Sequence, residues 1–312
     1  MNAPRIRSAL FVPTNRQRFL DGIERRGADA VILDLEDGIT SDRRDEARAN
    51  VTAWLSGRRP GSGPELFVRI NRLGVGLVDA DLRAVVHPAL RGVVLPKVSS
   101  AADVRELSVA LAWHEGRQGL PLGSILIWPL IETAAAVSAA AEIANADPRV
   151  AYMGGATAPG GDLARELGFE VSPEGLETLV LRSQVLIAAR AAGVPNPVTG
   201  MYTDLDDPTG FEVFARQSRS LGYEGIMVIH PSHVSVANRV FVPDDAAVAE
   251  AYQVIAALEH AERDGEGAIR HGGRMIDTAM ADTARRVIAD HLSVKVHTTT
   301  GADTGADSTD ER

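Results

Sequence analysis

AVILDLED, residues 30–37, joins a run of apolar residues directly to a group of carboxylates. The run is too apolar to show the alternation of a half-exposed strand, which is typical of a parallel strand buried on both faces. Runs of the same kind recur along the chain. We predict strands in SALFVP (8–13), AVILDLED (30–37), LFVRIN (66–71), GVVLPK (92–97), SILIWPLIE (124–132), VAYMGG (150–155), PVTGMY (197–202) and IMVIHP (226–231).

Helical patterns separate these strands. The clearest is EGLETLVLRSQVLIAARAAG, residues 174–193, whose last residue, Gly193, is suited to a helix C-cap. Several of its apolar residues fall on one stripe and predict an amphipathic helix: Leu176, Leu179, Val180, Leu186 and Ile187. Residues 101–113 and 132–144 are also predicted to be helical.

Strands that alternate with helices predict an α/β fold with a parallel sheet. The eight predicted strands are the number that closes a (β/α)8 TIM barrel, a fold of about 250 residues. An open, doubly wound sheet is the alternative. A dinucleotide-binding sheet of that type would carry G-x-G-x-x-G after its first strand, whereas this chain has TNRQRF there.

We expect three segments along the chain. Residues 1–243 form the TIM barrel, and residues 244–294 form a C-terminal helical lid extension with helices near 245–263 and 279–291. The tail, residues 295–312, is polar and low in complexity, and we expect it to be disordered.

Composition limits the possible partners. The net charge of -10 argues against nucleic acid, whose phosphates select basic surfaces. The chain has no cysteine, which excludes disulfides, zinc-thiolate sites and cysteine nucleophiles. Its first residues, MNAPRIRSALFVP, lack the apolar core of a signal peptide, and no apolar run is long enough to span a bilayer. We therefore expect a cytoplasmic protein with no nucleic-acid or membrane partner.

Polar residues collect at the carboxyl ends of the predicted strands, which is where TIM barrels carry their active sites. They are Asp34, Glu36, Asp37, Arg69, Asn71, Lys97, Glu132, Asp162 and His230. Any single one is more often a structural residue such as a helix cap. Together they put several carboxylates and two cations on one rim, which is costly unless a metal or ligand joins them.

A glycine-rich loop precedes one of these carboxylates. MGGATAPGGDLARELG, residues 153–168, has the spacing of a phosphate-binding P-loop, but it places Gly161 and Asp162 where that motif needs Lys and Ser/Thr. We interpret the loop as one that positions Asp162. Glu132 and Asp162 end adjacent strands and predict a Mg²⁺ site, because Mg²⁺ takes one or two carboxylates and leaves its other positions to water and substrate.

Six segments in this order and spacing resemble the citrate lyase beta-subunit-like family of CoA-ester lyases, in the HpcH/HpaI aldolase/citrate lyase superfamily. They are AVILDLEDGI, LFVRIN, VVLPKV, LIETAAAV, GGDLARELG and IHPSHVSVANRVFVP. The resemblance implies a TIM barrel enzyme with bound Mg²⁺. Such an enzyme cleaves or condenses a 3-hydroxyacyl-CoA, such as malyl-CoA, citramalyl-CoA or citryl-CoA, releasing or joining an acyl-CoA and a 2-keto acid.

The resemblance also implies roles for particular residues. Glu132 and Asp162 are the metal ligands, Arg69 holds the substrate and stabilises enolate charge, and Asp37 falls at the catalytic acidic position. The segment GAIRHGGRMIDTAMADTARRVI (267–288) resembles the lid of malyl-CoA-type lyases, in which the residue matching Asp277 reaches into a neighbouring subunit. We therefore expect a homo-oligomer, either a trimer or a hexamer.

CoA carries phosphates, so an acidic protein needs a local basic patch to bind it. Arg18 and Lys97 are our candidates for that contact. Two positions depart from the family pattern. Gly161 replaces the Glu of the usual G-A-E-D-L, and His233 replaces the usual Gln.

The same residues are compatible with several other functions. A thioesterase acting on malyl-CoA would use the same metal with a water molecule, and a citrate lyase beta subunit would act on a citryl group held by an acyl-carrier protein. A barrel aldolase acting on free hydroxy-keto acids and a non-catalytic binding protein are the remaining alternatives.

Overall fold

The structure is a computed structural model, and it describes residues 3–300 except 156, 157, 159, 173 and 264. The chain divides into two compact units, Met1–Phe241 and Val242–Arg312.

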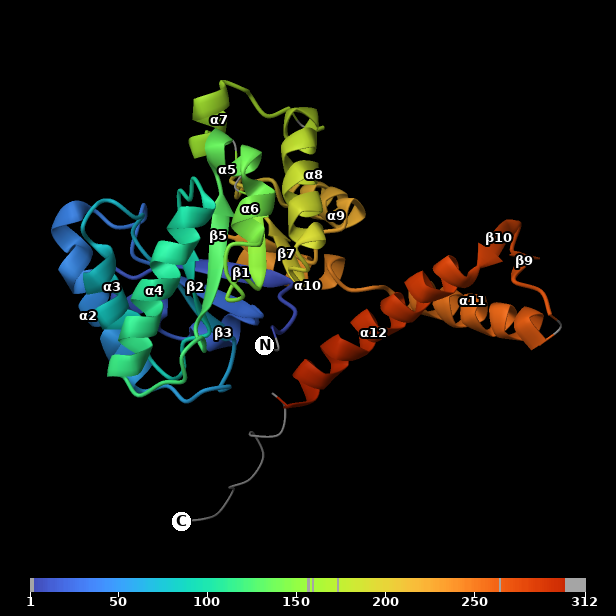
Figure 1. The fold of residues 1–312 in the computed structure, drawn as a ribbon, viewed down its shortest axis with the longest axis horizontal. Coiled ribbons are helices and arrows are strands. Elements are labelled where there is room, and N and C mark those ends of the chain that lie inside the picture. Colours follow the sequence, from blue (N-terminus) through green and yellow to red (C-terminus); the bar gives the residue numbers. More distant parts are fainter. Residues whose placement is uncertain (1–2, 156–157, 159, 173, 264, 301–312) are drawn as a thin grey trace, which may run out of the picture. The chain divides into compact units, whose positions relative to one another are not determined.

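The first unit is a closed barrel of eight parallel strands that follow one another in chain order (Figure 1). This confirms the predicted (β/α)8 fold. Most predicted runs extend past the strand into the loop that follows it, and these loops carry the polar residues. The strands are β1 (Ser8–Pro13), β2 (Ala30–Asp34), β3 (Glu65–Arg69), β4 (Gly92–Leu95), β5 (Leu126–Ile131), β6 (Tyr152–Gly155), β7 (Asn196–Thr199) and β8 (Gly225–Val228).

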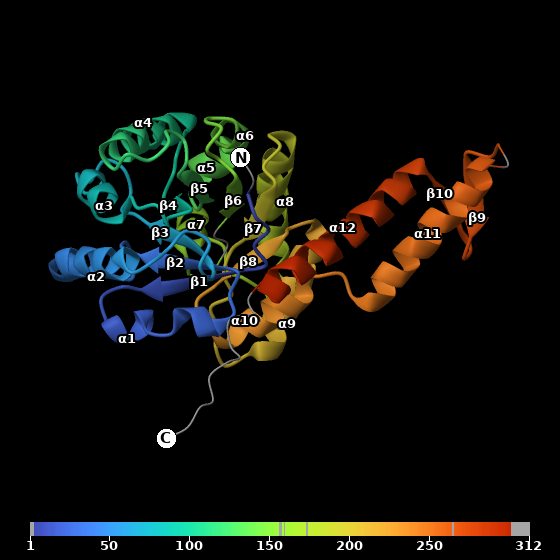
Figure 2. The ribbon, with the colours of Figure 1, turned by 90° about the horizontal axis from the view of Figure 1, so that it is seen from below.

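Helices surround the barrel, as Figure 2 shows. The predicted helix over 132–144 is divided into two short ones, because Ala139 has a ψ of 13° and leaves the helical region. The helices are α1 (Gln17–Leu20), α2 (Arg44–Ser56), α3 (Val78–Val85), α4 (Ala101–Arg117), α5 (Ala134–Ser138), α6 (Ala140–Ala144), α7 (Asp162–Leu167), α8 (Leu176–Ala191), α9 (Pro208–Leu221) and α10 (Ser232–Val240), with the short 3-10 turns η1 (Ile23–Arg26) and η2 (Ser41–Arg43).

Aromatic rings fill the inside of the barrel. Phe67, Trp128 and Tyr152 are fully buried, and their ring centroids lie 5.1–5.3 Å apart. The Tyr152 hydroxyl donates a hydrogen bond to the carbonyl of Pro4 at 2.9 Å, which ties the N-terminal arm to the amino ends of the strands. The interior is therefore a packed core and not a pore.

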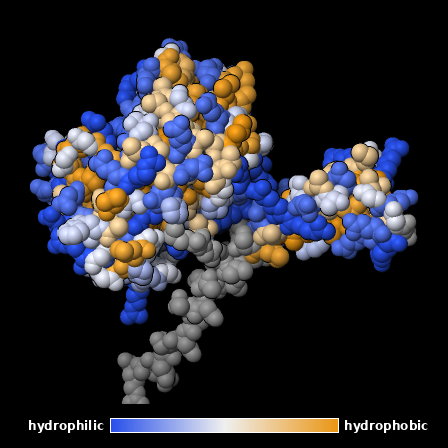
Figure 3. All heavy atoms as spheres, viewed as in Figure 1, coloured by the Kyte–Doolittle hydropathy of each residue, from blue (hydrophilic) through white to orange (hydrophobic). Residues whose placement is uncertain are grey.

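Helix α8 forms where we predicted it, but the apolar stripe that we expected it to bury is mostly exposed. Of the stripe, only Leu186 is buried, whereas Leu176, Val180 and Ile187 are 67–71% exposed and Leu179 is also exposed. Apolar atoms are visible on this side of the barrel unit in Figure 3. The helix buries smaller and polar residues instead: Thr178, Arg182, Val185, Ala188 and Ala189, besides Leu186. The predicted end of the helix is confirmed, because Gly193 has a φ of +73° and its N–H donates to the Arg190 carbonyl.

The second unit contains α11 (Asp245–Arg263), an antiparallel hairpin of β9 (Ala268–His271) and β10 (Arg274–Asp277), and α12 (Thr278–Thr300). Both predicted helices form, but α12 runs through residues 295–300, which we expected in the disordered tail. The rest of the predicted tail, residues 301–312, lies outside the described residues. In the described part of the chain, no helix is both long and apolar enough to cross a membrane.

Candidate active site

Asp34 and Arg69 form a buried ion pair at the carboxyl ends of β2 and β3. The two residues are direct partners in the sheet register. Arg69 donates through Nε and Nη2 to the two carboxylate oxygens of Asp34 at 2.7 and 2.8 Å. Asp34 also accepts the N–H of Gly38 at 2.9 Å. A Cβ at Gly38 would lie 2.4 Å from that carboxylate, so only glycine allows this approach.

The pairing fixes the Arg69 guanidinium in one orientation. Burial alone would lower the pKa of Arg69, but the bonds to Asp34 raise it above its usual range, so the group stays charged. Its remaining nitrogen, Nη1, lies 3.2 Å from Oε2 of Glu36. Arg69 is therefore a permanent, pre-oriented positive charge at the barrel rim.

Lys97 follows β4 with a φ of +51°, and it is the one non-glycine residue in the described part of the chain with a positive φ. This left-handed conformation is strained for a lysine, typically by about 1–3 kcal/mol. It turns the backbone N–H toward Glu132, whose Oε1 accepts it at 2.7 Å. The side chain turns the other way, and Nζ donates to Glu36 at 2.5 Å and to Asp37 at 2.9 Å.

These contacts bear on the predicted role of Lys97 at CoA. The ammonium lies among carboxylates, and a further one, Asp162, has its Oδ2 3.8 Å from Nζ. The ion pairs hold the pKa of Lys97 above its usual range against the opposing effect of burial. The structure thus places Lys97 inside the acidic site and not on an open basic patch, so a phosphate contact is not favoured by this geometry.

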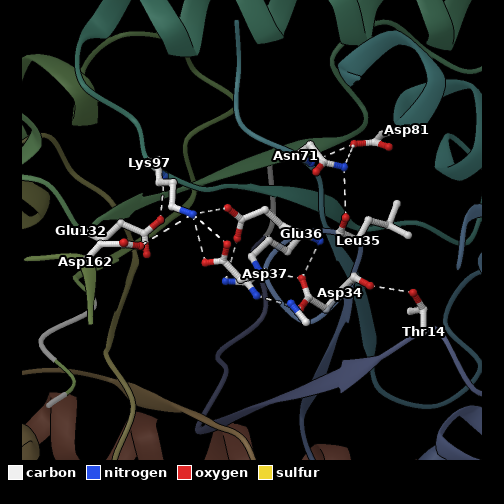
Figure 4. A network of polar contacts seen from close by, with 12 residues as sticks. Thr14, Asp34, Leu35, Glu36, Asp37, Asn71, Asp81, Lys97, Glu132 and Asp162 are labelled. Carbon is white, nitrogen blue, oxygen red and sulfur yellow. Dashed lines mark hydrogen bonds and ion pairs between the residues drawn. The ribbon is translucent and has the colours of Figure 1, made fainter. Parts of the chain in front are cut away.

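Glu132 and Asp162 lie side by side, as predicted (Figure 4). Glu132 follows β5 and is 5% exposed, and Asp162 is the first residue of α7. Burial raises the pKa of Glu132 to about 7, although the Lys97 N–H and the Arg69 charge oppose that rise. Asp162 adds to the rise and itself pairs with Arg165. Burial therefore makes Glu132 hold a proton more readily than an exposed glutamate does.

This pair of carboxylates fits a hard divalent cation. No group of three or more His, Asp or Glu among the described residues can hold a metal ion. Mg²⁺ does not need such a group, since one or two carboxylates suffice when water and substrate supply the other ligands. A cation bound between Glu132 and Asp162 would also offset the burial that raises the pKa of Glu132.

Glu36 is a site residue whose role we did not predict, although it was among the strand-end carboxylates. It is 7% exposed, and burial raises its pKa. Asp37, to which we gave the catalytic role, is more open, and the Lys97 hydrogen bonds lower its pKa against the effect of burial. The signal in the sequence is the position of Glu36 in the group of carboxylates that directly follows β2.

Two other predicted residues make separate contacts, each within its own unit. Arg18 lies on α1, exposed, with its guanidinium 4.9 Å from the centroid of the Phe19 ring. Asp277 ends β10 in the second unit, where its Oδ1 accepts the N–H of Met280 at 3.0 Å and caps α12. Their predicted roles at CoA and in the lid remain predictions.

A (β/α)8 barrel that gathers carboxylates, an arginine and a lysine at the carboxyl ends of its strands defines the class of TIM-barrel enzymes, whose active sites lie at those ends. The model of one family in that class, described as HpcH/HpaI aldolase/citrate lyase, matches residues 7–231. The chain belongs to this family, which confirms the resemblance inferred from the sequence segments.

Known proteins are similar over nearly the whole chain. Citrate lyase subunit beta of Leuconostoc mesenteroides subsp. cremoris is 35% identical and covers 94% of this chain and 97% of its own length. A (3S)-malyl-CoA thioesterase of Cereibacter sphaeroides is also 35% identical, covering 91% and 93%. The crystal structure of CitE from Mycobacterium tuberculosis in complex with magnesium, acetoacetate and coenzyme A is 29% identical with a TM-score of 0.75, covering 93% of this chain and 98% of that one.

Proposed function

We propose that this protein is a Mg²⁺-dependent carbon–carbon lyase. It cleaves, or in reverse forms, a 3-hydroxyacyl-CoA, with an acyl-CoA and a 2-keto acid as the other partners. The observation that carries the proposal is the placement of Glu132 and Asp162 beside the fixed charge of Arg69 and the Glu36–Lys97–Asp37 cluster. The magnesium and coenzyme A in the similar M. tuberculosis structure support the same assignment.

The residues divide the chemistry as follows. Glu132 and Asp162 would hold Mg²⁺, which when bound supplies Lewis-acid polarisation of the substrate's hydroxyl or keto oxygen. Glu36 or Asp37 accepts the hydroxyl proton as the carbon–carbon bond breaks. The electron pair of that bond becomes an acyl-CoA enolate, whose charge Arg69 stabilises before protonation gives the acyl-CoA.

The relatives leave two reactions to be separated for this chain. One relative is named as a lyase subunit and another as a thioesterase, at the same identity. Lyase action releases a 2-keto acid together with an acyl-CoA, whereas thioester hydrolysis releases free CoA. A citryl group on an acyl-carrier protein is the third substrate to be tested.

The test is a coupled assay of purified protein with malyl-CoA, citramalyl-CoA and citryl-CoA, with Mg²⁺ or with EDTA. Asp162→Ala is the loss variant, and Glu142→Ala, an exposed carboxylate on α6, is the matched control. We expect Mg²⁺-dependent release of a keto acid that Asp162→Ala abolishes and Glu142→Ala does not. Free CoA without keto acid would reassign the protein to the thioesterases, and EDTA-resistant activity would contradict the metal role.

We infer in addition that Asp277 completes the site of a neighbouring subunit in a trimer or hexamer. The inference rests on the resemblance of residues 267–288 to a lid segment. Mixing inactive Asp162→Ala protein with inactive Asp277→Ala protein should restore part of the activity through mixed oligomers. Full activity of Asp277→Ala, or a monomeric mass in light scattering of fully active protein, would contradict it.

A further inference from the structure

A cavity of about 500 Å³ opens next to the carboxylate cluster, and the proposed roles leave part of its lining unexplained. It borders Asp162 and Lys97 on one side. All of its lining residues are polar or charged: Arg72, Lys97, Thr133, Asp162, Arg165 and Glu166. An apolar substrate group would gain little in such a cavity, so its lining selects a charged or strongly polar one.

The cavity carries an excess of positive charge once the metal ligands are accounted for. Lys97 is matched by Glu36 and Asp37. Glu166 accepts the N–H of Ala134 at 3.0 Å and so caps α5. When Asp162 binds a cation, the two arginines, Arg72 and Arg165, are therefore the positively charged groups at the cavity to which we have assigned no partner.

The two arginines differ in their present contacts. Arg72 is exposed just after β3 and forms no ion pair with any described residue. Arg165 lies on α7, pairs with Asp162, and donates from Nη1 to the Gly160 carbonyl at 3.3 Å. When Asp162 directs its oxygens to a cation, Arg165 loses much of this pairing and can turn to another anion.

We propose that Arg72 and Arg165 form a subsite for a second carboxylate on the acid part of the substrate. This inference rests on the proposed function and narrows it to thioesters whose 2-keto acid is a dicarboxylate, as in the cleavage of citryl-CoA to oxaloacetate. A planar guanidinium fork suits a carboxylate. The phosphates of CoA are excluded from this subsite because the whole pantetheine arm separates them from the reacting carbons beside Asp162.

The keto acids that the alternative substrates would release also favour a substrate whose keto acid is a dicarboxylate. Malyl-CoA and citramalyl-CoA would release glyoxylate and pyruvate, which carry a hydrogen or a methyl group where oxaloacetate carries a carboxymethyl group. Those small groups would face a cavity lined by the guanidinium groups of Arg72 and Arg165 without offering either of them an anion. A carboxylate there would pair with both.

The test measures binding and needs no turnover. The probes are malate and lactate, stable 2-hydroxy analogues of oxaloacetate and pyruvate, titrated by calorimetry at saturating Mg²⁺. Malate should bind the native protein about tenfold more tightly than lactate, the low end for hydrogen bonds to a charged group. Arg165→Gln and Arg72→Gln should each reduce this ratio severalfold without changing lactate affinity. Arg117→Gln, an exposed residue at the C-terminal end of α4, should leave the ratio unchanged.

The outcomes separate the two proposals. Equal affinity for malate and lactate, both requiring Mg²⁺, overturns the subsite and leaves the lyase proposal standing. A malate preference that survives both arginine variants also overturns it. Failure of the native protein to bind Mg²⁺ in the same calorimeter overturns the proposed function and this inference with it. A preference that falls in both variants, but not in Arg117→Gln, establishes the subsite.

Discussion

Replacing Asp34 by Asn tests the buried pair that holds Arg69. Both side chains are about nine-tenths buried, and the change leaves the guanidinium without its bidentate partner. Breaking a buried pair in this way costs about 3–5 kcal/mol of unfolding free energy. Glu36 remains 3.2 Å from Nη1 and compensates in part, so we expect about 3 kcal/mol, the low end of that range. For a unit of this size that corresponds to a decrease in melting temperature of about 6–12 °C.

The assay is urea unfolding followed by circular dichroism, alongside lyase turnover. Asp29→Asn is the matched control, because Asp29 forms the same bidentate pair with Arg7 at the opposite ends of the strands. That pair is more exposed, so its loss should cost less, and turnover should persist. Asp34→Asn should lose both stability and turnover. A cost below about 1 kcal/mol, the value of a surface pair, would refute the reasoning.

Further predictions concern the proposed metal ligand Glu132, Gly38 and the two faces of helix α8. Mg²⁺ binding requires ionised Glu132, and burial raises the metal-free pKa of this residue to about 7. The apparent affinity for Mg²⁺ should therefore fall about tenfold per unit of pH below 7. Calorimetry that shows no pH dependence would exclude Glu132 as a ligand. The sign for stability is opposite, since folded Glu132 holds its proton more tightly than the unfolded chain, so the metal-free protein should lose stability as pH rises from about 5 to 7 in urea titrations. Gly38→Ala should destabilise the barrel by about 1–3 kcal/mol through its clash with Asp34, and an unchanged urea midpoint would contradict this. Ile187→Ser on the exposed face of α8 should change the free energy of unfolding by less than about 0.5 kcal/mol. Val185→Ala on the buried face should lower it by about 1–2 kcal/mol. The reverse order in urea unfolding would mean that the predicted stripe is the buried face after all.

The barrel strands could be predicted from the sequence because each is buried on both faces. Such strands must be apolar throughout, so runs such as AVILD stand out without any alternation. The helices that cover them are harder to orient. On α8, close packing against the barrel favours small residues such as Ala188 and Ala189, and larger apolar residues such as Val180 remain outside. Prediction from periodicity favours large apolar residues, so it assigned the exposed face of α8 to the core.

The residues of the site could be predicted better than their pairings. The carboxyl ends of parallel strands meet at one rim, which is enough to bring Glu132, Asp162 and Arg69 together. The sequence does not reveal that Asp34 rather than a substrate holds Arg69, because that contact depends on the register of two strands. Nor does it reveal the left-handed backbone of Lys97, which a lysine adopts only when the surrounding structure imposes it.

Because aromatic rings fill the interior of the barrel, ligands reach the site from one end of the barrel only. With Phe67, Trp128 and Tyr152 packed in the lumen and the N-terminal arm tied beneath them, no route leads from the rim to the opposite end through the described residues. Substrate, products, protons and water all share one entrance. A bulky ligand bound at that entrance would therefore also limit the access of bulk water to the carboxylate cluster.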